Sequence, residues 1–89
     1  MTEKIFRKED KVYRLICELI IEYNKASYRL KLTWKMKGKR KWLELPNYVN
    51  EYRWETKTED ILKYLTKEEV IAAATEEYLK YAPKEVIKL

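Results

Sequence analysis

The chain has 89 residues and carries 20 Lys and Arg against 15 Asp and Glu, a net charge of +5. This length suits one domain with a modest core, which we expect to span residues 1–89. The chain has no histidine, one cysteine and one glycine, which excludes a Ser-His-Asp or Cys-His site, a His- or Cys-based zinc site, an internal disulfide and a glycine-rich phosphate loop. We therefore expect a non-catalytic protein with no cofactor and no metal.

No signal peptide or membrane segment is predicted. The longest apolar stretch, residues 70–74, has five residues, and others such as Leu19-Ile20-Ile21 have three, so all are too short to cross a bilayer. We expect a soluble cytoplasmic protein in which Cys17 is a reduced, half-buried thiol.

Residues 1–8 show no sustained hydrophobic period, whereas residues 10–25 show the 3.6-residue period of a helix. Glu9 or Asp10 is placed to cap the start of this helix, and Asn24 weakens its far end. The sequence therefore predicts an N-terminal helix with an apolar stripe of Val12, Leu15, Ile16, Leu19, Ile20 and Tyr23.

Residues 28–36 alternate with a period of two, which is typical of a half-buried antiparallel strand. Gly38 follows, and a second short strand is predicted over residues 40–45. The two form a hairpin if Gly38-Lys39 makes a two-residue type II′ turn, with glycine at the first central position. A four-residue loop would preserve which residues face inward, so the length of the turn stays open.

The hairpin register follows from the pattern of apolar residues. We expect Trp34 to face Leu43 on the buried side and Lys35 to face Trp42 on the outer side. A shift by one residue would place Trp34 beside Glu44 and break the pattern.

The segment after the hairpin is ambiguous. Pro46-Asn47 ends the second strand, and residues 51–56 are interpreted as a third strand because Tyr52 and Trp54 alternate with polar residues. Tyr48 and Tyr52 also suit a helix, so residues 48–56 remain open between the two.

Two helices are predicted in the last third of the chain. Thr58 is placed to cap a short helix, with Ile61, Leu62 and Leu65 pointing inward. The residues from Thr66 to Glu69 form a capping box, so a longer helix begins at Lys67, and Pro83 ends it. The expected inward face of this helix is Val70, Ile71, Ala74, Tyr78, Tyr81 and Ala82.

Together these elements predict an α+β fold. It consists of an N-terminal helix, an antiparallel β-hairpin with a third strand, and a short and a long C-terminal helix packed on one face. A homodimer is expected, because a small core with an apolar C-terminal tail gains stability from pairing.

The excess positive charge lies in the hairpin. Segments 1–23, 24–43 and 44–89 carry charges of 0, +8 and −3, and the middle segment contains no acidic residue. Lys and Arg can neutralise phosphates, and an exposed Trp can stack on a base. The hairpin is therefore the candidate nucleic-acid-binding site, for DNA or RNA with low sequence specificity, through Arg29, Lys31, Lys35, Lys37, Lys39, Arg40, Lys41 and Trp42.

Two other interpretations of the basic hairpin stay open. It can be a solvated face that blocks edge pairing or joins two copies of the chain through the acidic C-terminal helix. It can also bind an acidic protein partner, which would make the chain a protein-interaction or inhibitor module.

Two stretches are similar to known families. Glu55-Thr56-Lys57, after a hairpin carrying Glu44, is similar to the core of PD-(D/E)XK nucleases. That resemblance implies Glu44 and Glu55 as magnesium ligands and Lys57 as the base that positions water, although Glu44 stands where the family usually has Asp.

The second resemblance lies in the long helix. Residues 66–79 look like the second helix of ribbon-helix-helix repressors. In that family a preceding strand reads DNA as part of a dimeric ribbon, which the resemblance assigns to residues 40–45. The glycine that usually precedes the cap of that helix is missing here.

Overall fold

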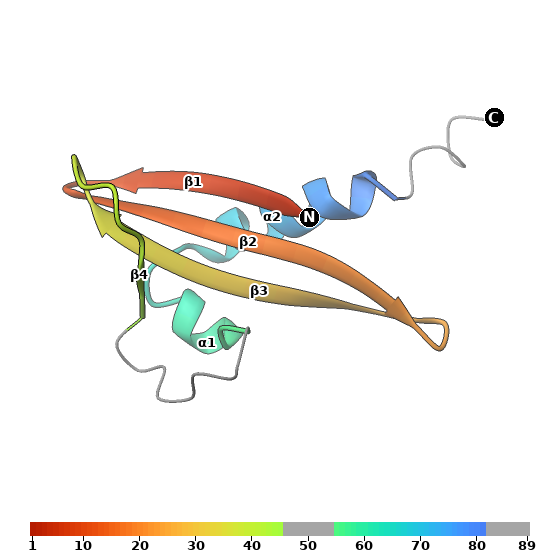
Figure 1. Ribbon diagram of the computed structural model, residues 1–89. Coiled ribbons are helices and arrows are strands. Elements are labelled where there is room, and N and C mark those ends of the chain that lie inside the picture. The colour runs from red at the N-terminus through yellow and green to blue at the C-terminus, as the bar shows by residue number, and fades with distance from the viewer. Residues whose placement is uncertain (46–54, 82–89) are drawn as a thin grey trace.

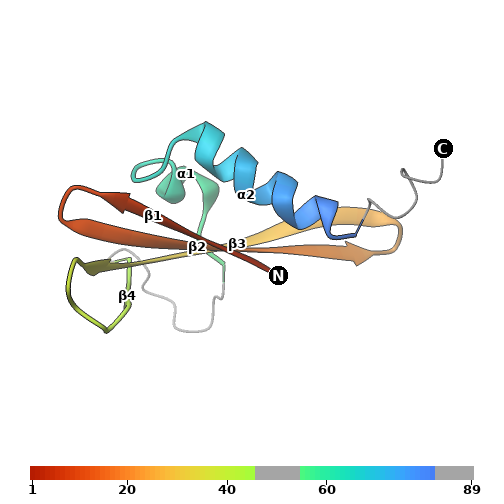
Figure 2. The same cartoon turned by 90° about the horizontal axis from the view of Figure 1, so that it is seen from above.

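The computed structural model describes residues 1–45 and 55–81. A four-stranded antiparallel sheet carries two helices on one face (Figures 1 and 2). The strands follow one another in the sheet in chain order and are β1 (Thr2–Lys8), β2 (Lys11–Glu22), β3 (Lys25–Met36) and β4 (Leu43–Glu44). The helices are α1 (Thr58–Ile61) and α2 (Lys67–Leu79). The α+β class is consistent with the prediction, but the predicted order of elements is not.

The predicted N-terminal helix over residues 10–25 is wrong, because this segment forms β2 and the turn after it. The odd-numbered residues from Tyr13 to Leu19 are apolar and buried against the helices, as one face of a strand. Val12, Ile16 and Ile20 lie on the opposite face of the same strand. Because apolar residues lie on both faces of the strand, they match the i, i+3, i+4 spacing of a helix, and the pattern wrongly predicts one.

The turn between β2 and β3 explains why the chain reverses at this point. Tyr23 and Asn24 have φ angles of 50° and 62°. Two consecutive positive φ angles define a type I′ turn, whose twist matches that of the flanking strands. Asn24, expected to weaken a helix, therefore acts as a hairpin residue, since asparagine tolerates this conformation better than most side chains.

Residues 1–8 contain β1, although their sequence shows no clear period. The period is hidden because the helix-facing residues Lys4 and Lys8 are charged. Lys4 Nζ lies 3.0 Å from a carboxylate oxygen of Glu76, and Lys8 Nζ pairs with Glu69, both on α2. Lys4 and Lys8 therefore face the helices, where α2 supplies their acidic partners.

The predicted strand over residues 28–36 is present, and β3 begins earlier, at Lys25. The expected pairing of Trp34 with Leu43 is confirmed. The second strand is shorter than predicted, since only Leu43 and Glu44 pair with β3.

The predicted type II′ turn at Gly38-Lys39 is wrong. The Lys39 N–H donates to the Met36 carbonyl at 3.0 Å, which makes Lys37 and Gly38 the central residues of the turn. Gly38 has a φ of 88°, as the second central residue of a type II turn requires. Residues 39–42 then lead into β4 as a loop.

The longer C-terminal helix starts where the sequence predicts. The Glu69 N–H donates to the Thr66 hydroxyl and the Thr66 N–H donates to the Glu69 carboxylate, so the capping box is complete. The predicted inward face is only partly right. Val70 and Ala74 pack on the core, but Ile71, Tyr78 and Tyr81 are about half exposed and Ala73 is buried instead. Ala82 and Pro83 lie outside the described residues.

The short helix α1 comprises four residues, and no side chain caps its start. Its predicted inward residues Ile61 and Leu65 are buried, whereas Leu62 is exposed. The core lies between the helices and the inner face of the sheet, and consists of Tyr13, Leu15, Cys17, Leu32, Leu45, Ile61, Leu65 and Ala73.

The predicted third strand over residues 51–56 lies mostly outside the described residues. Its last two residues, Glu55 and Thr56, are described and are not in a strand. Thr56 still bonds to the edge of β3: its N–H donates to the Leu30 carbonyl at 2.6 Å, and its hydroxyl accepts from the Leu32 N–H at 3.0 Å. Part of the β3 edge is therefore covered.

A buried carboxylate joins α2 to the sheet. The Glu77 side chain is fully buried and accepts from the Leu19 N–H at 2.8 Å and the Thr2 hydroxyl at 2.9 Å, with the amino group of Met1 3.2 Å away. Burial alone would raise the pKa of Glu77, but these hydrogen bonds and the nearby amino group outweigh it and lower the pKa. Glu77 therefore stays ionised and satisfies a β2 backbone group that β1 is too short to reach.

Cys17 is fully buried beside this carboxylate rather than half-buried as expected. Burial and the negative charge of Glu77 raise the pKa of its thiol to about 11. The thiol is therefore protonated at neutral pH and poorly reactive.

Candidate nucleic-acid interface

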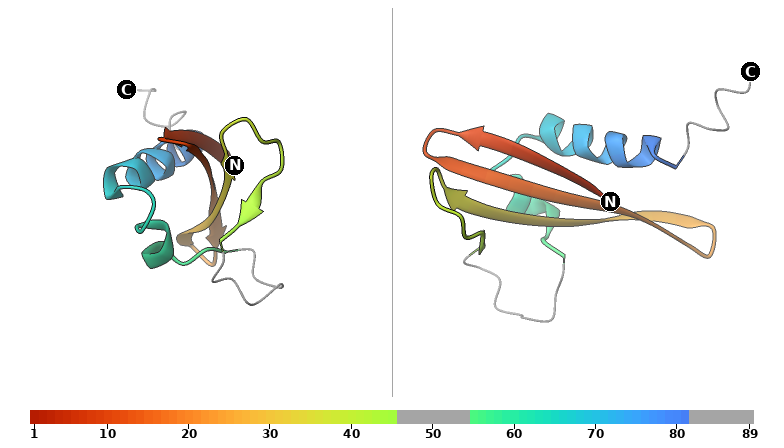
Figure 3. Two further views of the ribbon diagram at one scale, coloured as in Figure 1. Left: turned by 90° about the vertical axis from the view of Figure 1, so that its left-hand side faces the viewer. Right: turned by 45° about the horizontal axis from the view of Figure 1, so that its top comes forward.

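The side of the sheet away from α1 and α2 is called the open face here. In β3 the residues Arg29, Lys31 and Lys35 alternate with the core-facing Leu30, Leu32 and Trp34, so the predicted cations share the open face. The loop before β4 also stands on this side of the sheet (Figures 2 and 3). The structure therefore brings together strand and loop cations that the sequence singled out.

Two of the predicted cations have acidic partners. Arg29 Nε lies 3.2 Å from a carboxylate oxygen of Glu55, and Lys31 Nζ lies 3.3 Å from one of Glu44. Glu18 is also directly across from Arg29 in the β2–β3 ladder. Such exposed pairs each add only about 0.2–1 kcal/mol to stability, but they cancel local positive charge. We call this region, with Arg29 and Lys31, the paired end.

Trp42, the residue before β4, lies on the open face and contacts the side chain of Lys35. Its ring centroid is 4.8 Å from Lys35 Nζ and 4.6 Å from the guanidinium carbon of Arg14. Each such cation–π contact is worth about 0.5–1 kcal/mol at an exposed site. Trp42 therefore fixes the loop against the sheet and keeps two cations close to its ring.

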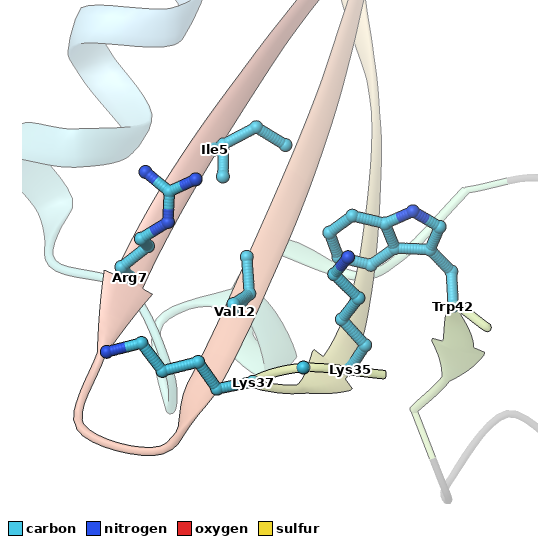
Figure 4. A pocket seen from close by; sticks show the side chains of 7 residues that line it. Ile5, Arg7, Val12, Lys35, Lys37 and Trp42 are labelled. Atoms are coloured by element: carbon cyan, nitrogen blue, oxygen red, sulfur yellow. The ribbon is translucent and has the colours of Figure 1, made fainter. Parts of the chain in front are cut away.

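A concave pocket opens between the sheet and this loop (Figure 4). Its volume is about 340 Å³, and its apolar floor is formed by Ile5 of β1 and Val12 of β2. Around that floor stand three cations and an indole ring, contributed by Arg7, Lys35, Lys37 and Trp42, and Gly38 completes the lining. The pocket thus offers positive charge around an apolar surface.

The loop itself adds more cations beside the pocket. Lys37, Lys39, Arg40 and Lys41 are all exposed, and within residues 1–45 and 55–81 none of them forms a salt bridge. We call the cations of this loop and of the pocket the basic end, which consists of Arg7, Lys35, Lys37, Lys39, Arg40 and Lys41.

Two described acidic residues lie close to the basic end without forming a salt bridge with it. The Lys37 N–H donates to the Asp10 carbonyl at 2.8 Å, which holds the loop against the turn between β1 and β2. This turn carries Glu9 and Asp10, whose carboxylates form no salt bridge to a described residue. They moderate the local potential, and the hydrogen bond fixes where the loop lies.

Sequence reasoning missed two cations of the open face, Arg7 and Arg14. Arg7 lines the pocket and Arg14 contacts Trp42. The sequence predicts no element over residues 1–8 and a helix over residues 10–25, so it gives no reason to place either arginine beside the basic hairpin. Recognising Tyr23-Asn24 as a hairpin turn would have supplied the missing signal, since it extends the period-two pattern back along β2.

The two carboxylates that the nuclease resemblance assigns to magnesium are both engaged in salt bridges. Glu44 pairs with Lys31 and Glu55 with Arg29. The described residues contain no group of three acidic or cysteine side chains that could hold a metal ion. Likewise, Leu43 and Glu44 pair with β3 of their own chain, whereas the repressor resemblance needs a strand that pairs with a second copy.

Comparison with protein-family models, with curated proteins and with solved structures returns no match. In the part of the chain that the structure describes, no helix is long and apolar enough to cross a membrane.

Proposed function

We propose that this protein binds nucleic acid through the basic end of its open face, without catalysis and with low sequence specificity. The observation that carries the proposal is the group of exposed loop cations, unpaired among the described residues, beside a pocket lined by Arg7, Lys35 and Lys37. A polyanion is the ligand that such a cluster attracts most strongly, because each bound phosphate releases condensed counterions.

Low sequence specificity follows from the types of side chain involved. Lysines dominate the basic end, and a lysine ammonium contacts phosphate as a mobile point charge. Trp42 already contacts Arg14 and Lys35, so its ring supports the cations as well as offering an apolar surface. These groups position a phosphate backbone and do not read base edges.

The proposal is tested by fluorescence anisotropy with labelled single- and double-stranded DNA and RNA over a salt series. If the six cations of the basic end each met a phosphate, log K would fall against log salt with a slope of about −5 for duplex DNA or about −4 for a single strand. The slope also reports how many phosphates are bound.

A pair of charge-reversed variants separates a local site from net charge. Lys39→Glu with Lys41→Glu changes the basic end, and Lys57→Glu with Lys67→Glu makes the same change of charge at exposed positions on the helical side. We expect the first variant to lose at least about tenfold in affinity and the control at most about threefold. Equal losses, or no salt-dependent binding by the wild type, would contradict the proposal.

A protein-interaction role is the second candidate, and a different surface favours it. Ile21, Tyr23, Tyr78 and Tyr81 are each more than half exposed, at the far end of β2 and on or just after α2. Exposed aromatic and aliphatic side chains are common at interfaces. Co-purification of one stoichiometric protein partner, together with failure of the anisotropy test, would favour this role.

A further inference from the structure

No strand within residues 1–45 and 55–81 pairs with the outer side of the β1 backbone. Strand β1 forms one edge of the sheet in the described residues, with β2 as its only neighbour. The opposite edge differs, because β4 pairs with Thr33 and Trp34 and Thr56 bonds to Leu30 and Leu32. An exposed edge strand is a template for pairing with another strand.

The hydrogen bonds identify which residues of β1 point their backbone outward. The Leu32 N–H donates to Thr56, away from β2, so its partner Leu15 directs its own backbone groups toward β1. Lys4 of β1 is the partner of Leu15, so its backbone N–H and C=O groups point toward β2 and bond to those of Leu15. Since successive residues of a strand point opposite ways, the outward N–H and C=O groups belong to Glu3, Ile5 and Arg7.

A second bond confirms this assignment. The Leu19 N–H is bonded by Glu77, which also bonds Thr2 at the start of β1. Odd-numbered residues of β2 therefore face β1, in agreement with the direction deduced for Leu15.

The side chains of these three residues are complementary to the same three side chains of a second copy arranged antiparallel. Glu3 and Arg7 are exposed charges of opposite sign, placed symmetrically about Ile5, whose side chain is 46% exposed. If two copies of β1 meet antiparallel with Ile5 opposite Ile5, then Glu3 lies opposite Arg7 of the second copy, and Arg7 opposite its Glu3. Opposite charges across a strand pair are stabilising, and like charges are destabilising.

We propose that β1 is a homodimerisation edge, at which two copies of this chain join their sheets antiparallel about a two-fold axis at Ile5. Three facing residue pairs exchange two hydrogen bonds each, about six in total. The interface is isologous, as closed two-fold dimers require.

The charge pattern selects this arrangement against its alternatives. Parallel in-register pairing places Glu3 against Glu3 and Arg7 against Arg7. Antiparallel registers shifted by two residues leave at least one of these charges facing Ile5. Lys4 and Lys8 do not oppose pairing as free cations, because Glu76 and Glu69 hold them on the helical side.

The two-fold axis stands perpendicular to the sheet, so both open faces lie on the same side of the dimer. Ile5 and Arg7 line the pocket of each copy. The two pockets therefore adjoin the axis, and the second copy places its Glu3 beside Arg7. The dimer depends on the strand edge alone and does not require nucleic-acid binding.

The test measures self-association by sedimentation equilibrium across about a hundredfold concentration range. Glu3→Arg places Arg against Arg, and Arg7→Glu places Glu against Glu. Each single variant should raise the dimer Kd by at least about tenfold. The double variant with both substitutions restores opposite charges and should return the Kd to within about threefold of the wild type.

A wild type that stays monomeric throughout, or a Glu3→Arg variant that dimerises as the wild type does, overturns the proposal. Unchanged far-UV circular dichroism shows that the exposed substitutions leave the fold intact. Glu3 lies outside the basic end, so failure of this proposal leaves the anisotropy test of nucleic-acid binding unaffected.

An engineered disulfide checks the register directly. Facing residues in a hydrogen-bonded antiparallel pair have Cα atoms about 5.5 Å apart, within the range a disulfide spans. Ile5→Cys should therefore form a covalent dimer under mild oxidation, while Tyr23→Cys at the opposite end of the sheet should not. Buried Cys17 is too poorly reactive to compete. Equal cross-linking of the two variants would contradict the register.

Discussion

The two faces of the sheet use the same residue types in different ways. On the helical face, Lys4 and Lys8 pair with carboxylates of α2, and Glu77 bonds the backbone of β2. On the open face, Arg29 and Lys31 of the paired end form salt bridges, while the cations of the basic end form none with the described residues. Charge on the first face therefore supports the fold, and excess charge on the second is available to a ligand.

This difference shows that net charge alone does not locate a binding surface. Arg29 and Lys31 belong to the most basic segment of the chain, yet the fold brings Glu55 and Glu44 to them from later in the sequence. Arg7 comes from a segment with no net charge and still joins the pocket. What matters is which acids the fold brings within reach of each cation.

The largest expected effect comes from the helical face. Glu77→Ala removes the acceptor for the Leu19 N–H and the Thr2 hydroxyl, leaving buried donors unsatisfied. We expect a loss of about 2–4 kcal/mol in the free energy of unfolding, measured by urea denaturation. Glu77→Gln keeps the volume and one acceptor oxygen, so it should lose less. Equal stability of Glu77→Ala and wild type would contradict this role.

Acidic pH should lower the free energy of unfolding by protonating Glu77. The pKa of Glu77 is lower in the folded state than its ordinary value of 4.5, so the unfolded state binds more protons below that pH. Its stabilising contribution is complete above about pH 4.5 and is lost as the pH falls through the folded pKa. Wild type should therefore lose more stability than Glu77→Gln between neutral pH and pH values below 4.5 in urea titrations.

The open face should respond in binding rather than in folding. Lys37→Ala with Lys39→Ala removes two cations from the basic end, and Arg29→Ala with Lys31→Ala removes two from the paired end. We expect the first pair to weaken nucleic-acid binding about tenfold and to make the salt slope shallower by about 2, and the second to weaken it about twofold. The reverse order would show that the paired end is the binding surface. Melting temperatures should change little in either variant.

The smallest expected effect lies in the turn between β2 and β3. Tyr23 is almost fully exposed and adopts a φ of 50°, a conformation that tyrosine accepts poorly. Tyr23→Asn should stabilise the protein by about 0.5 kcal/mol, because asparagine favours type I′ turns. A loss of thermal stability would show that the tyrosine ring makes a contact that stabilises the hairpin.

How much of the fold follows from sequence depends on whether its signals are local. The capping box at Thr66, the alternation in β3 and the pairing of Trp34 with Leu43 follow from neighbouring residues and are correct. Strand β2 is missed because it is apolar on both faces. Strand β1 is missed because its inward lysines make sense only when α2 is in place.

In the candidate site too, local features follow from the sequence and long-range contacts do not. The alternation places Lys35 and Trp42 together on the outer face, as the structure does. The neutralisation of Lys31 by Glu44 and the approach of Arg7 to the loop depend on long-range folding, which no spacing in the sequence reveals. The sequence thus locates the hairpin and its cations, but it does not reveal which of these cations are neutralised by acidic residues.

The tip of the β2–β3 ribbon extends past the end of β1. The β2–β3 ladder continues to Glu22 and Lys25, well past Cys17, where β1 begins its pairing. Beyond Leu19 the ribbon is two strands wide and its side chains are mostly exposed. Isolated two-stranded ribbons are only marginally stable in water, so the tip should open locally without global unfolding. Its amide protons should exchange with deuterium well before those of Leu15 and Leu32, which makes the protected core shorter than the strands themselves.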